Sequence, residues 1–437
     1  IDRFGEAPLR QHFSKSWRLS IALAVLLSAL LLALLVHTSS AGIGVWGTSI
    51  PFVWGFDLAN YAWWIGVANG TSLLATLLVL WRSPLRVATN RFAETMALAA
   101  AVCAAIFPVV HLGKPWLAYW MAPYPAHTGL WPQPLSPLTW DFWGILTHLI
   151  AVALFWFVGL IPDLANLRDR ARPGWRRKAY GLFALGWRGT AEQWVLHART
   201  HRLLALSVIP FLFVMQTVVA LELAVTIVPD WHDTALPVRF VVEGWALGVA
   251  VAYFFAAIFR RGFDPESGRE MLDDLGRILL VASLIAAFVV GLTTLIGWLG
   301  PSGEDTAIQR WTTGEGAWLS WTSIMLSKLA PQLLWFRRMR LSALVSGTVA
   351  LCAMVGVWFD FLAVMVIGLI EGRLIRPEVL YSPSFVEFAL LAGSIGLFAL
   401  FALYINLIFG VVFTKKEGTA WITASTAPSS RSPEDAS

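Results

Sequence analysis

Ten long apolar runs dominate the chain, and short polar segments separate them. The first run, IALAVLLSALLLALLV, contains no charged residue. About 20 apolar residues are needed to cross the hydrocarbon core of a bilayer, so each run predicts a transmembrane helix. The runs cover residues 18–38, 54–81, 92–111, 141–162, 201–228, 240–259, 276–299, 318–336, 343–370 and 385–413. The sequence therefore predicts an all-α polytopic membrane protein with about ten transmembrane helices.

The order of these spans is compatible with an internal repeat. Spans 2–5 and 6–9 would each form a four-helix unit that begins on the same side, so an axis along the membrane normal would relate them. Spans 1 and 10 would flank the two units. We expect three segments: an N-terminal segment 1–17, a membrane domain 18–413, and a Ser-, Pro- and Thr-rich tail 414–437 that is disordered.

The composition supports the membrane assignment. Hydrophobic residues make up 57% of the chain and charged residues 14%, whereas an ordinary soluble domain is about 25% charged. These values exclude a soluble enzyme, a disordered protein and a nucleic-acid-binding domain. The net charge of +5 does not indicate a nucleic-acid partner. In a membrane protein, the basic residues usually mark the cytoplasmic loops.

Lysine and arginine set the predicted orientation. Of the 32 basic residues, 24 lie in the N-terminal segment together with the adjoining Arg18, in the loops after even-numbered spans and in the tail, against five in the other loops. This asymmetry predicts that both termini are cytoplasmic.

Two connecting segments are long. Residues 112–140 are rich in Pro and Trp and should form an ordered outer lid or docking surface. Residues 163–200 are basic and cytoplasmic, and within them Tyr180 to Arg199 predicts an amphipathic helix on the membrane surface. A lipid headgroup anchor is the favoured interpretation of that helix over a specific binding site.

Ionisable side chains gather in the half of the spans that should face outward. This group comprises Asp57, His111, Asp141, Glu222, Glu243, Asp360, Glu371, Arg373 and Glu387. Glu94 is the main acidic residue of the inner half. One alternative is that helix ends tolerate charge, but this does not explain why the carboxylates lie mostly in the outer half. A second alternative is a docking surface for a charged partner at the outer face. We expect instead a proton-handling site near the outer face.

A transmembrane proton path is a second hypothesis for the buried charges. Its members would be Asp57, Glu94, Glu243, Lys328 and Asp360, which come from several spans. Lys328 lies within a span, three residues before Pro331, and would pair with Glu94 or Asp360 across the bundle. Snorkelling of Lys328 to the interface is the alternative.

Metal ligands are scarce in the sequence. Cys103 and Cys352 are the two cysteines, whereas an iron–sulfur cluster typically takes four. A haem between helices needs two ligands at matching depth, and His111 and His148 differ in depth. His197 and His201 have the i, i+4 spacing of metal ligands, but no third group completes a set. We expect no metal, haem or cluster bound by this chain.

Several motifs together are similar to a known family. They are WGTSIPFVWGFDLANYAWWIG (46–66), RFAETM (91–96), FPVVHLGKPWLAYW (107–120), WDFWGI (140–145), VPDWHDTALP (228–237) and PQLLWF (331–336). The chain resembles the NrfD/PsrC-like quinone-interacting membrane subunits, most closely the larger-loop type called ActC in bacterial alternative complex III. The resemblance implies two four-helix bundles with flanking helices and a quinol site near the outer face.

The resemblance also implies site residues. The histidine of the HLG motif is His111, and the aspartate that opens the next span is Asp141. The acidic residue late in span 5 is Glu222, where relatives have Asp, and the arginine after span 9 falls at Arg373. Lys114 stands where the family usually has Arg. The planar guanidinium of Arg can bind an anion through two hydrogen bonds, whereas the ammonium of Lys acts as a point charge. Trp64 and Trp116 are candidates for the wall of the ring pocket.

The function that follows is quinol oxidation, with menaquinol as the expected substrate. His111 would take one proton, Asp141 a second, and Glu222 would relay protons outward while Arg373 holds an oxygen. The expected partners are an outer iron–sulfur subunit, multihaem cytochromes of the c type, a second NrfD-like membrane subunit and lipids.

Two other functions stay open at this point. One is a quinone-reacting anchor of a molybdopterin reductase or a Qrc-like complex, which would share the fold and the site. The other is a secondary transporter, which would have broken helices around a midplane site. A structural scaffold is a further alternative.

Overall fold

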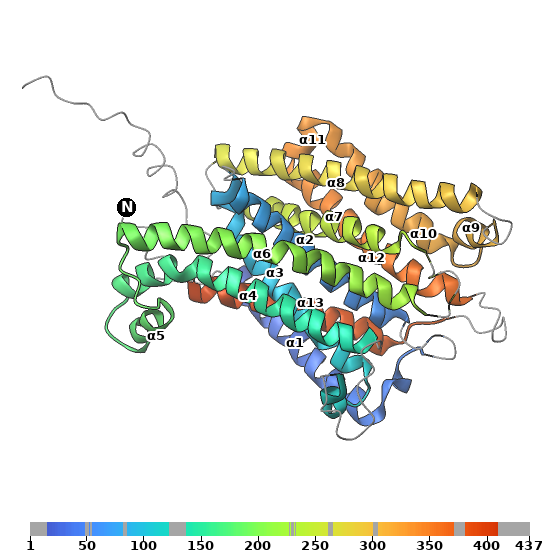
Figure 1. Ribbon diagram of the computed structural model, residues 1–437, viewed down its shortest axis with the longest axis horizontal. Coiled ribbons are helices and arrows are strands. Elements are labelled where there is room, and N and C mark those ends of the chain that lie inside the picture. The colour runs from blue at the N-terminus through green and yellow to red at the C-terminus, as the bar shows by residue number, and fades with distance from the viewer. Residues whose placement is uncertain are drawn as a thin grey trace, which may run out of the picture.

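The computed structural model is built of helices throughout the part of the chain that it describes (Figure 1). The described residues are 15–48, 52, 55–81, 85–121, 137–226, 228, 231, 233–260, 265–299, 305–370 and 381–409. Among them, nine helices are long and apolar enough to cross a membrane. The predicted tail 414–437, most of segment 1–17 and the centre of the loop 112–140 lie outside these residues.

The long helices follow the predicted spans closely. They are α1 (Lys15–Ala41), α2 (Gly55–Leu80), α3 (Leu85–His111), α4 (Pro137–Arg170), α6 (Ala191–Ala224), α7 (Leu236–Phe259), α8 (Pro265–Leu299), α12 (Ala343–Ile370) and α13 (Phe385–Phe409). Short helices connect them: η1 (Ile43–Val45), η2 (Pro115–Met121), α5 (Trp175–Phe183), α9 (Asp305–Thr312) and α11 (Arg337–Leu341).

The predicted span 318–336 is a broken helix. It comprises α10 (Ala317–Ser323), the π-helical turn η6 (Ile324–Leu329) and the 3₁₀ turn η7 (Ala330–Trp335). Pro331 lacks a backbone N–H and cannot continue an α-helix from within, which accounts for the change of winding at η7. A π-turn shifts the side chains of a helix relative to the regular register, and here Lys328 lies within that turn.

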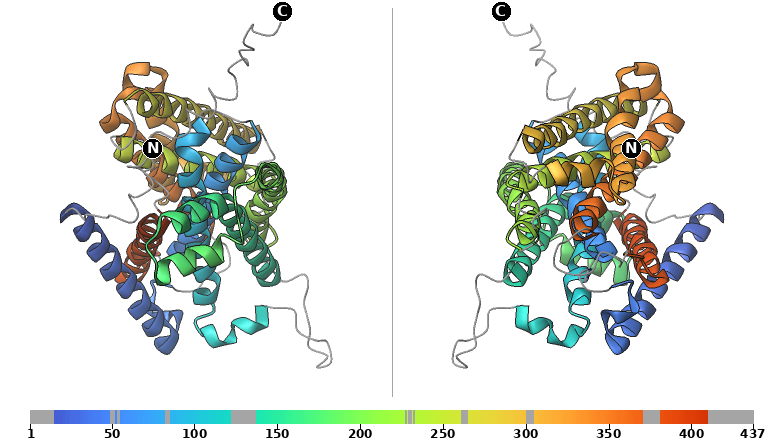
Figure 2. Two further views of the ribbon diagram at one scale, coloured as in Figure 1. Left: turned by 90° about the vertical axis from the view of Figure 1, so that its left-hand side faces the viewer. Right: turned by 90° about the vertical axis from the view of Figure 1, so that its right-hand side faces the viewer.

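The helices pack as two groups of four. The first group is α2, α3, α4 and α6, and the second is α7, α8, the broken helix α10–η7 and α12. Helix α2 contacts α7 and α12 of the second group and thereby joins the two (Figure 1). Helices α1 and α13 pack together outside the first group (Figure 2).

Four glycines form the contact between α2 and α7. Gly66 and Gly70 lie one turn apart on α2, and Gly244 and Gly248 lie one turn apart on α7. A Cβ atom on Gly70 would lie 2.7 Å from the Cα of Gly248 and would overlap the carbonyl oxygen of Gly244. Small residues four apart allow this backbone approach, which dispersion forces then stabilise.

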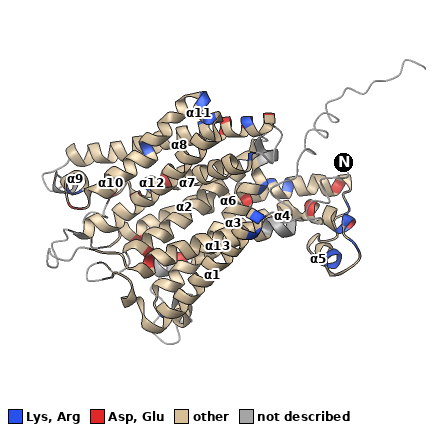
Figure 3. Ribbon diagram, turned by 180° about the vertical axis from the view of Figure 1, so that it is seen from behind, with Lys and Arg blue, Asp and Glu red and all other residues tan. Residues whose placement is uncertain are grey.

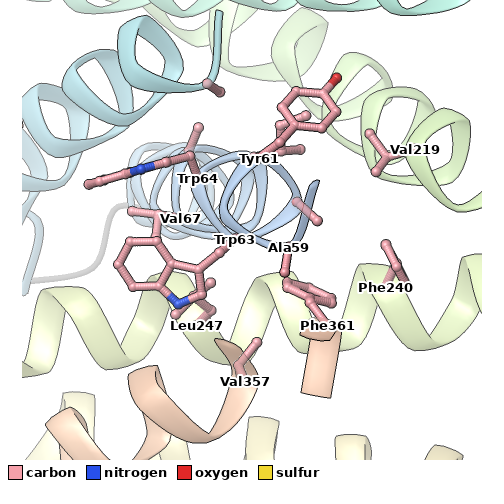
Figure 4. Close-up of a cluster of buried hydrophobic side chains, with 14 of the residues drawn as sticks. Ala59, Tyr61, Trp63, Trp64, Val67, Val219, Phe240, Leu247, Val357 and Phe361 are labelled. Carbon is pink, nitrogen blue, oxygen red and sulfur yellow. The ribbon is translucent and has the colours of Figure 1, made fainter. Parts of the chain in front are cut away.

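The apolar core surrounds α2 (Figure 4). Tyr61, Trp63 and Trp64 project from α2 in different directions, and Phe240 of α7 packs against Phe361 of α12 with ring centroids 4.8 Å apart. Helix α2 therefore has neighbours on all sides, and Asp57 and Asn60 are buried together with its apolar residues.

The basic end of the molecule differs from the prediction. Lys and Arg gather at the end that carries α5, α11 and the start of α8 (Figure 3). The single amphipathic helix predicted from Tyr180 to Arg199 is wrong, because the chain turns after α5 and restarts at Thr190, the N-cap of α6. Leu185 and Gly186 have positive φ angles of 48° and 73°, which end α5.

Substitution of Gly70 tests the α2–α7 contact. Gly70→Ala should destabilise the protein by about 1–3 kcal/mol, because the added methyl group overlaps the α7 backbone. Gly291→Ala on α8 is the matched control, since a Cβ there has no heavy atom within 4 Å. Thermal unfolding in detergent should show a lower midpoint for Gly70→Ala alone. An equal response of both variants would contradict the glycine packing.

Candidate functional site

A cluster of acidic groups, one histidine and one tyrosine is embedded at one end of the first helix group. We call it the His111 cluster: Asp57 and Tyr61 of α2, His111 of α3, Asp141 of α4 and Glu222 of α6. Asp57 is completely buried, and Asp141 and His111 are also buried. The four helices of the group thus each contribute to one polar site.

Direct contacts join the members of the His111 cluster in pairs. The Nε2 atom of His111 lies 2.7 Å from a carboxylate oxygen of Asp57. The Tyr61 hydroxyl donates to Asp141 at 2.5 Å, and the carboxyl groups of Asp141 and Glu222 are close enough to interact electrostatically. The rings of Tyr61 and His111 meet edge-on with centroids 5.7 Å apart, so the two pairs adjoin one another.

Local sequence explains these positions. Asp57 and Tyr61 are four residues apart and therefore lie on one face of α2. Asp57 occupies the first turn of α2, where the helix dipole favours an anion, and His111 is the last residue of α3, where it favours a cation. Gly113, with a φ of +65°, turns the chain directly after His111.

Residues around Tyr381 and Glu387 fix the entry to α2. Tyr381 accepts a hydrogen bond from the Phe56 N–H at 2.7 Å and donates to Glu387. Glu387 also accepts the Gly47 N–H at 2.7 Å. Burial, and then the bond to Glu387, raises the pKa of Tyr381, which keeps its hydroxyl protonated as the donor. Glu387, one of the predicted outer carboxylates, therefore positions the chain beside Asp57.

Trp46 and Tyr61 belong to the site and were missed by sequence reasoning. The buried Trp46 ring meets His111 edge-on at 6.4 Å between centroids. Tyr61 could have been found from its i, i+4 spacing to Asp57, which places both side chains on one face of α2. Trp46 follows η1, outside any span, and no pattern placed it near His111.

The other predicted site residues lie elsewhere. Trp64 donates to Ser394 of α13 at 2.9 Å and points away from Tyr61 (Figure 4). Trp116 lies on η2 and is 61% exposed, and Lys114 just before it is also exposed. Arg373 and Glu371 lie outside the described residues.

A second polar cluster lies inside the second helix group. We call it the Lys328 cluster: Arg239 and Glu243 of α7, Lys328 of η6 and Asp360 of α12. Arg239 donates to both oxygens of Asp360, at 3.1 and 2.7 Å, and Lys328 contacts Glu243. The predicted pairing of Lys328 with Glu94 or Asp360 is wrong. Glu94 belongs to the first helix group, and the carboxylate of Asp360 is paired with Arg239.

The sequence placed Arg239 in a loop, and this explains the missed pair. Helix α7 begins at Leu236 with a proline in its first turn, where proline is favoured. Arg239 is consequently inside the helix, buried, with its guanidinium 5.0 Å from the ring centre of Trp311.

A third polar cluster lies at the basic end of the first helix group. Glu94 accepts from Asn90, contacts Arg91 at 3.1 Å, and lies 3.3 Å from Nε2 of His201. The His201 ring stacks on Phe155, with centroids 4.8 Å apart. The described part of the chain contains no group of three or more His, Cys, Asp or Glu side chains that could hold a metal.

The five residues of the predicted proton path thus fall into three clusters. Asp57 joins the His111 cluster, Glu94 lies at the opposite end of the same group, and Glu243, Lys328 and Asp360 lie in the second group. The role of these five residues in proton translocation stays a prediction.

The His111 cluster and the Lys328 cluster differ in their balance of acidic and basic groups. The Lys328 cluster matches two acids with two bases, as a structural ion-pair network does. The His111 cluster combines three carboxyl groups with one imidazole and one phenol, and each of these can give or accept a proton. The fold and the His111 cluster together define a polytopic membrane protein with a buried cluster of titratable side chains at one end of a helix bundle.

Comparison with known proteins places this architecture in a family. The model of the family "Polysulphide reductase, NrfD" matches residues 44–371, which is most of the chain and includes all three polar clusters. The chain therefore belongs to the NrfD family, whose members are quinone-interacting membrane subunits of multi-subunit oxidoreductases. This confirms the family resemblance of the sequence motifs.

A curated relative gives a more distant comparison. The chain is 24% identical over 253 residues to the C component of the selenate reductase of Mesobacillus selenatarsenatis. The match covers 55% of this chain and 57% of the relative's length.

Breaking the Lys328 pair should destabilise the protein. Lys328→Met leaves the buried Glu243 carboxylate without its cation, which costs about 3–5 kcal/mol. The double variant Lys328→Met with Glu243→Gln should recover most of the loss, because neither charge remains. Chemical unfolding in detergent measures both effects.

Arg168→Ala is the control for this measurement. Arg168 pairs with Asp169 on the surface, and an exposed pair contributes about 0–1 kcal/mol. A double variant no more stable than Lys328→Met would contradict the pairing.

Proposed function

We propose that this chain is the quinol-binding membrane subunit of an electron-transfer complex and that quinol is oxidised at the His111 cluster. The observation that carries the proposal is the adjacency of two buried pairs: His111 lies 2.7 Å from an Asp57 carboxylate oxygen, and Tyr61 donates a hydrogen bond to Asp141. Oxidation of a quinol releases two electrons and two protons, so its site needs two proton acceptors close together.

The residues divide the two protons between them. His111 accepts the proton of one ring hydroxyl, and Asp57, 2.7 Å away, stabilises the imidazolium that results. Asp141 accepts the second proton and passes it to Glu222, the neighbouring carboxyl group. Tyr61 holds Asp141 in place through its hydroxyl. Arg373 is proposed to hold a quinone oxygen or a carboxylate.

The electrons leave through a partner subunit. The sequence has two cysteines, fewer than the four thiolates that usually hold an iron–sulfur cluster. An iron–sulfur subunit docked at the His111 end would accept the electrons. The distribution of Lys and Arg supports placing this end outside a bacterial inner membrane with both termini cytoplasmic, so that protons are released outward.

Two kinds of complex fit this role. The motifs around His111 and Asp141 support an alternative complex III, in which the chain would be the ActC subunit beside multihaem cytochrome c and a second NrfD-like subunit, with menaquinol as substrate. The similarity to the C component of a selenate reductase favours the membrane anchor of a molybdopterin reductase. The quinol site would be the same in both.

Substitutions in the His111 cluster test the quinol site. His111→Ala and Asp57→Asn should each lower kcat/KM for quinol oxidation by about 10²–10⁴-fold, because proton removal loses its base or the base loses its partner. His37→Ala is the control: this histidine lies on the exposed surface of α1 near the same end. Activity of the intact complex is measured with quinol and an artificial electron acceptor. Wild-type activity in His111→Ala would refute the site.

The composition of the purified complex separates the two assemblies. A complex isolated through a tag on this chain is analysed for iron, molybdenum and covalently bound haem. Haem c with iron–sulfur signals indicates an alternative complex III, and molybdenum with iron indicates a molybdopterin reductase. A stable preparation with quinol oxidation but without iron–sulfur signals would contradict the proposed electron route.

A further inference from the structure

An apolar groove runs along the outside of the first helix group at the His111 end. Its volume is about 670 Å³. It is lined by the last turns of α1 and α3 and by the start of η2: Leu35, Val36, Ser39, Ser40, Ala105, Ile106, Val109, Val110, Pro115 and Trp116. Figure 2 shows α1 inclined to the other helices, with η2 near its C-terminal end.

The two hydroxyl groups that line the groove already donate hydrogen bonds within α1. Ser39 donates its hydroxyl to the Leu35 carbonyl at 2.6 Å, and Ser40 donates to that of His37 at 2.8 Å. Both hydroxyls are thus satisfied within α1. A ligand that fits this lining is a hydrocarbon chain, because polar atoms would lose their hydrogen bonds with water and gain none.

The groove shares a wall with the His111 cluster. Val110 lines the groove and directly precedes His111 on α3. Val110 also packs in one buried apolar group with Trp46, whose ring meets His111 edge-on. Val110 and Trp46 thus connect the lining of the groove with the surroundings of the imidazole, and both features lie at the same end of α3.

We propose that the groove holds the isoprenoid tail of the quinol whose ring binds at the His111 cluster. This inference rests on the proposed function and adds the place of the tail. A quinol reaches the protein through the lipid, and its tail is a long apolar chain. Burying that chain between α1 and α3 leaves the ring beside Trp46 and Val110, next to the groups that accept its protons.

A bulky side chain placed in the groove should weaken the binding of a long-tailed quinol and leave that of a tailless quinol unchanged. Val109→Trp adds an indole to the groove and leaves every residue of the His111 cluster in place. We expect KM for a long-tailed quinol to rise about tenfold, which corresponds to about 1.4 kcal/mol of lost binding. For a tailless quinol analogue, kcat/KM should stay within about twofold of wild type.

Val281→Trp on α8 is the matched control. Val281 is an exposed apolar residue of the second helix group, so a tryptophan there meets lipid and should change neither substrate's kinetics. All assays use the intact complex in vesicles, with an artificial acceptor. A second variant, Ala105→Trp, fills the groove one turn away and should give the same pattern.

The outcomes separate the tail site from its rivals. An unchanged KM for the long-tailed quinol would overturn the inference, and loss of a co-purified phospholipid from the same variant would then assign the groove to a lipid acyl chain. Equal losses for both quinols would overturn it as well, because the effect would not depend on the tail. Full activity of His111→Ala with both quinols would instead refute the proposed function.

Discussion

The close contact between α2 and α7 is the constraint on which the rest of the structure depends. In a bilayer no hydrophobic force draws two helices together, because lipid chains are as apolar as the side chains. Gly66, Gly70, Gly244 and Gly248 remove the side chains from the contact, so that the two backbones touch. This places α2 at the centre of the molecule, where its polar residues can be enclosed by helices from both groups.

The glycine contact also sets α2 and α7 in register, and the two polar clusters can then be compared. Gly70 lies against Gly248 and Gly66 against Gly244, which aligns Tyr61 with Arg239. At this level the first helix group has a phenol that donates to Asp141, and the second has a guanidinium that donates to Asp360. The neutral phenol of Tyr61 allows Asp141 to gain and lose a proton. The permanently charged guanidinium of Arg239 instead keeps Asp360 as an anion. One arrangement suits proton transfer and the other suits stability.

Sequence reasoning found the spans and named four of the five residues that the fold brings together in the His111 cluster, and the misses have physical causes. Apolar runs and the acid-rich half of the spans are local patterns, so the long helices and His111 with Asp141 were predicted. Side-chain partners depend on rotation about helix axes, which a pattern fixes poorly. Trp64 was therefore assigned to a face of α2 that contacts α13. Arg239 was placed outside its helix for another reason, because α7 begins at Leu236, before the apolar run. The tight turn after α5 depends on backbone angles at single residues, which an amphipathic pattern does not report.

The pairing of α1 with α13 bears on how the protein is made. Gly393 and Gly396 of α13 lie directly against the backbone of α1 around Leu31 and Leu27. These are the first and last long helices of the described chain, and chain synthesis proceeds from the N-terminus. Helix α1 is therefore inserted long before its main neighbour exists. The wall that α1 contributes to the apolar groove therefore gains its main neighbour only when α13 has been synthesised.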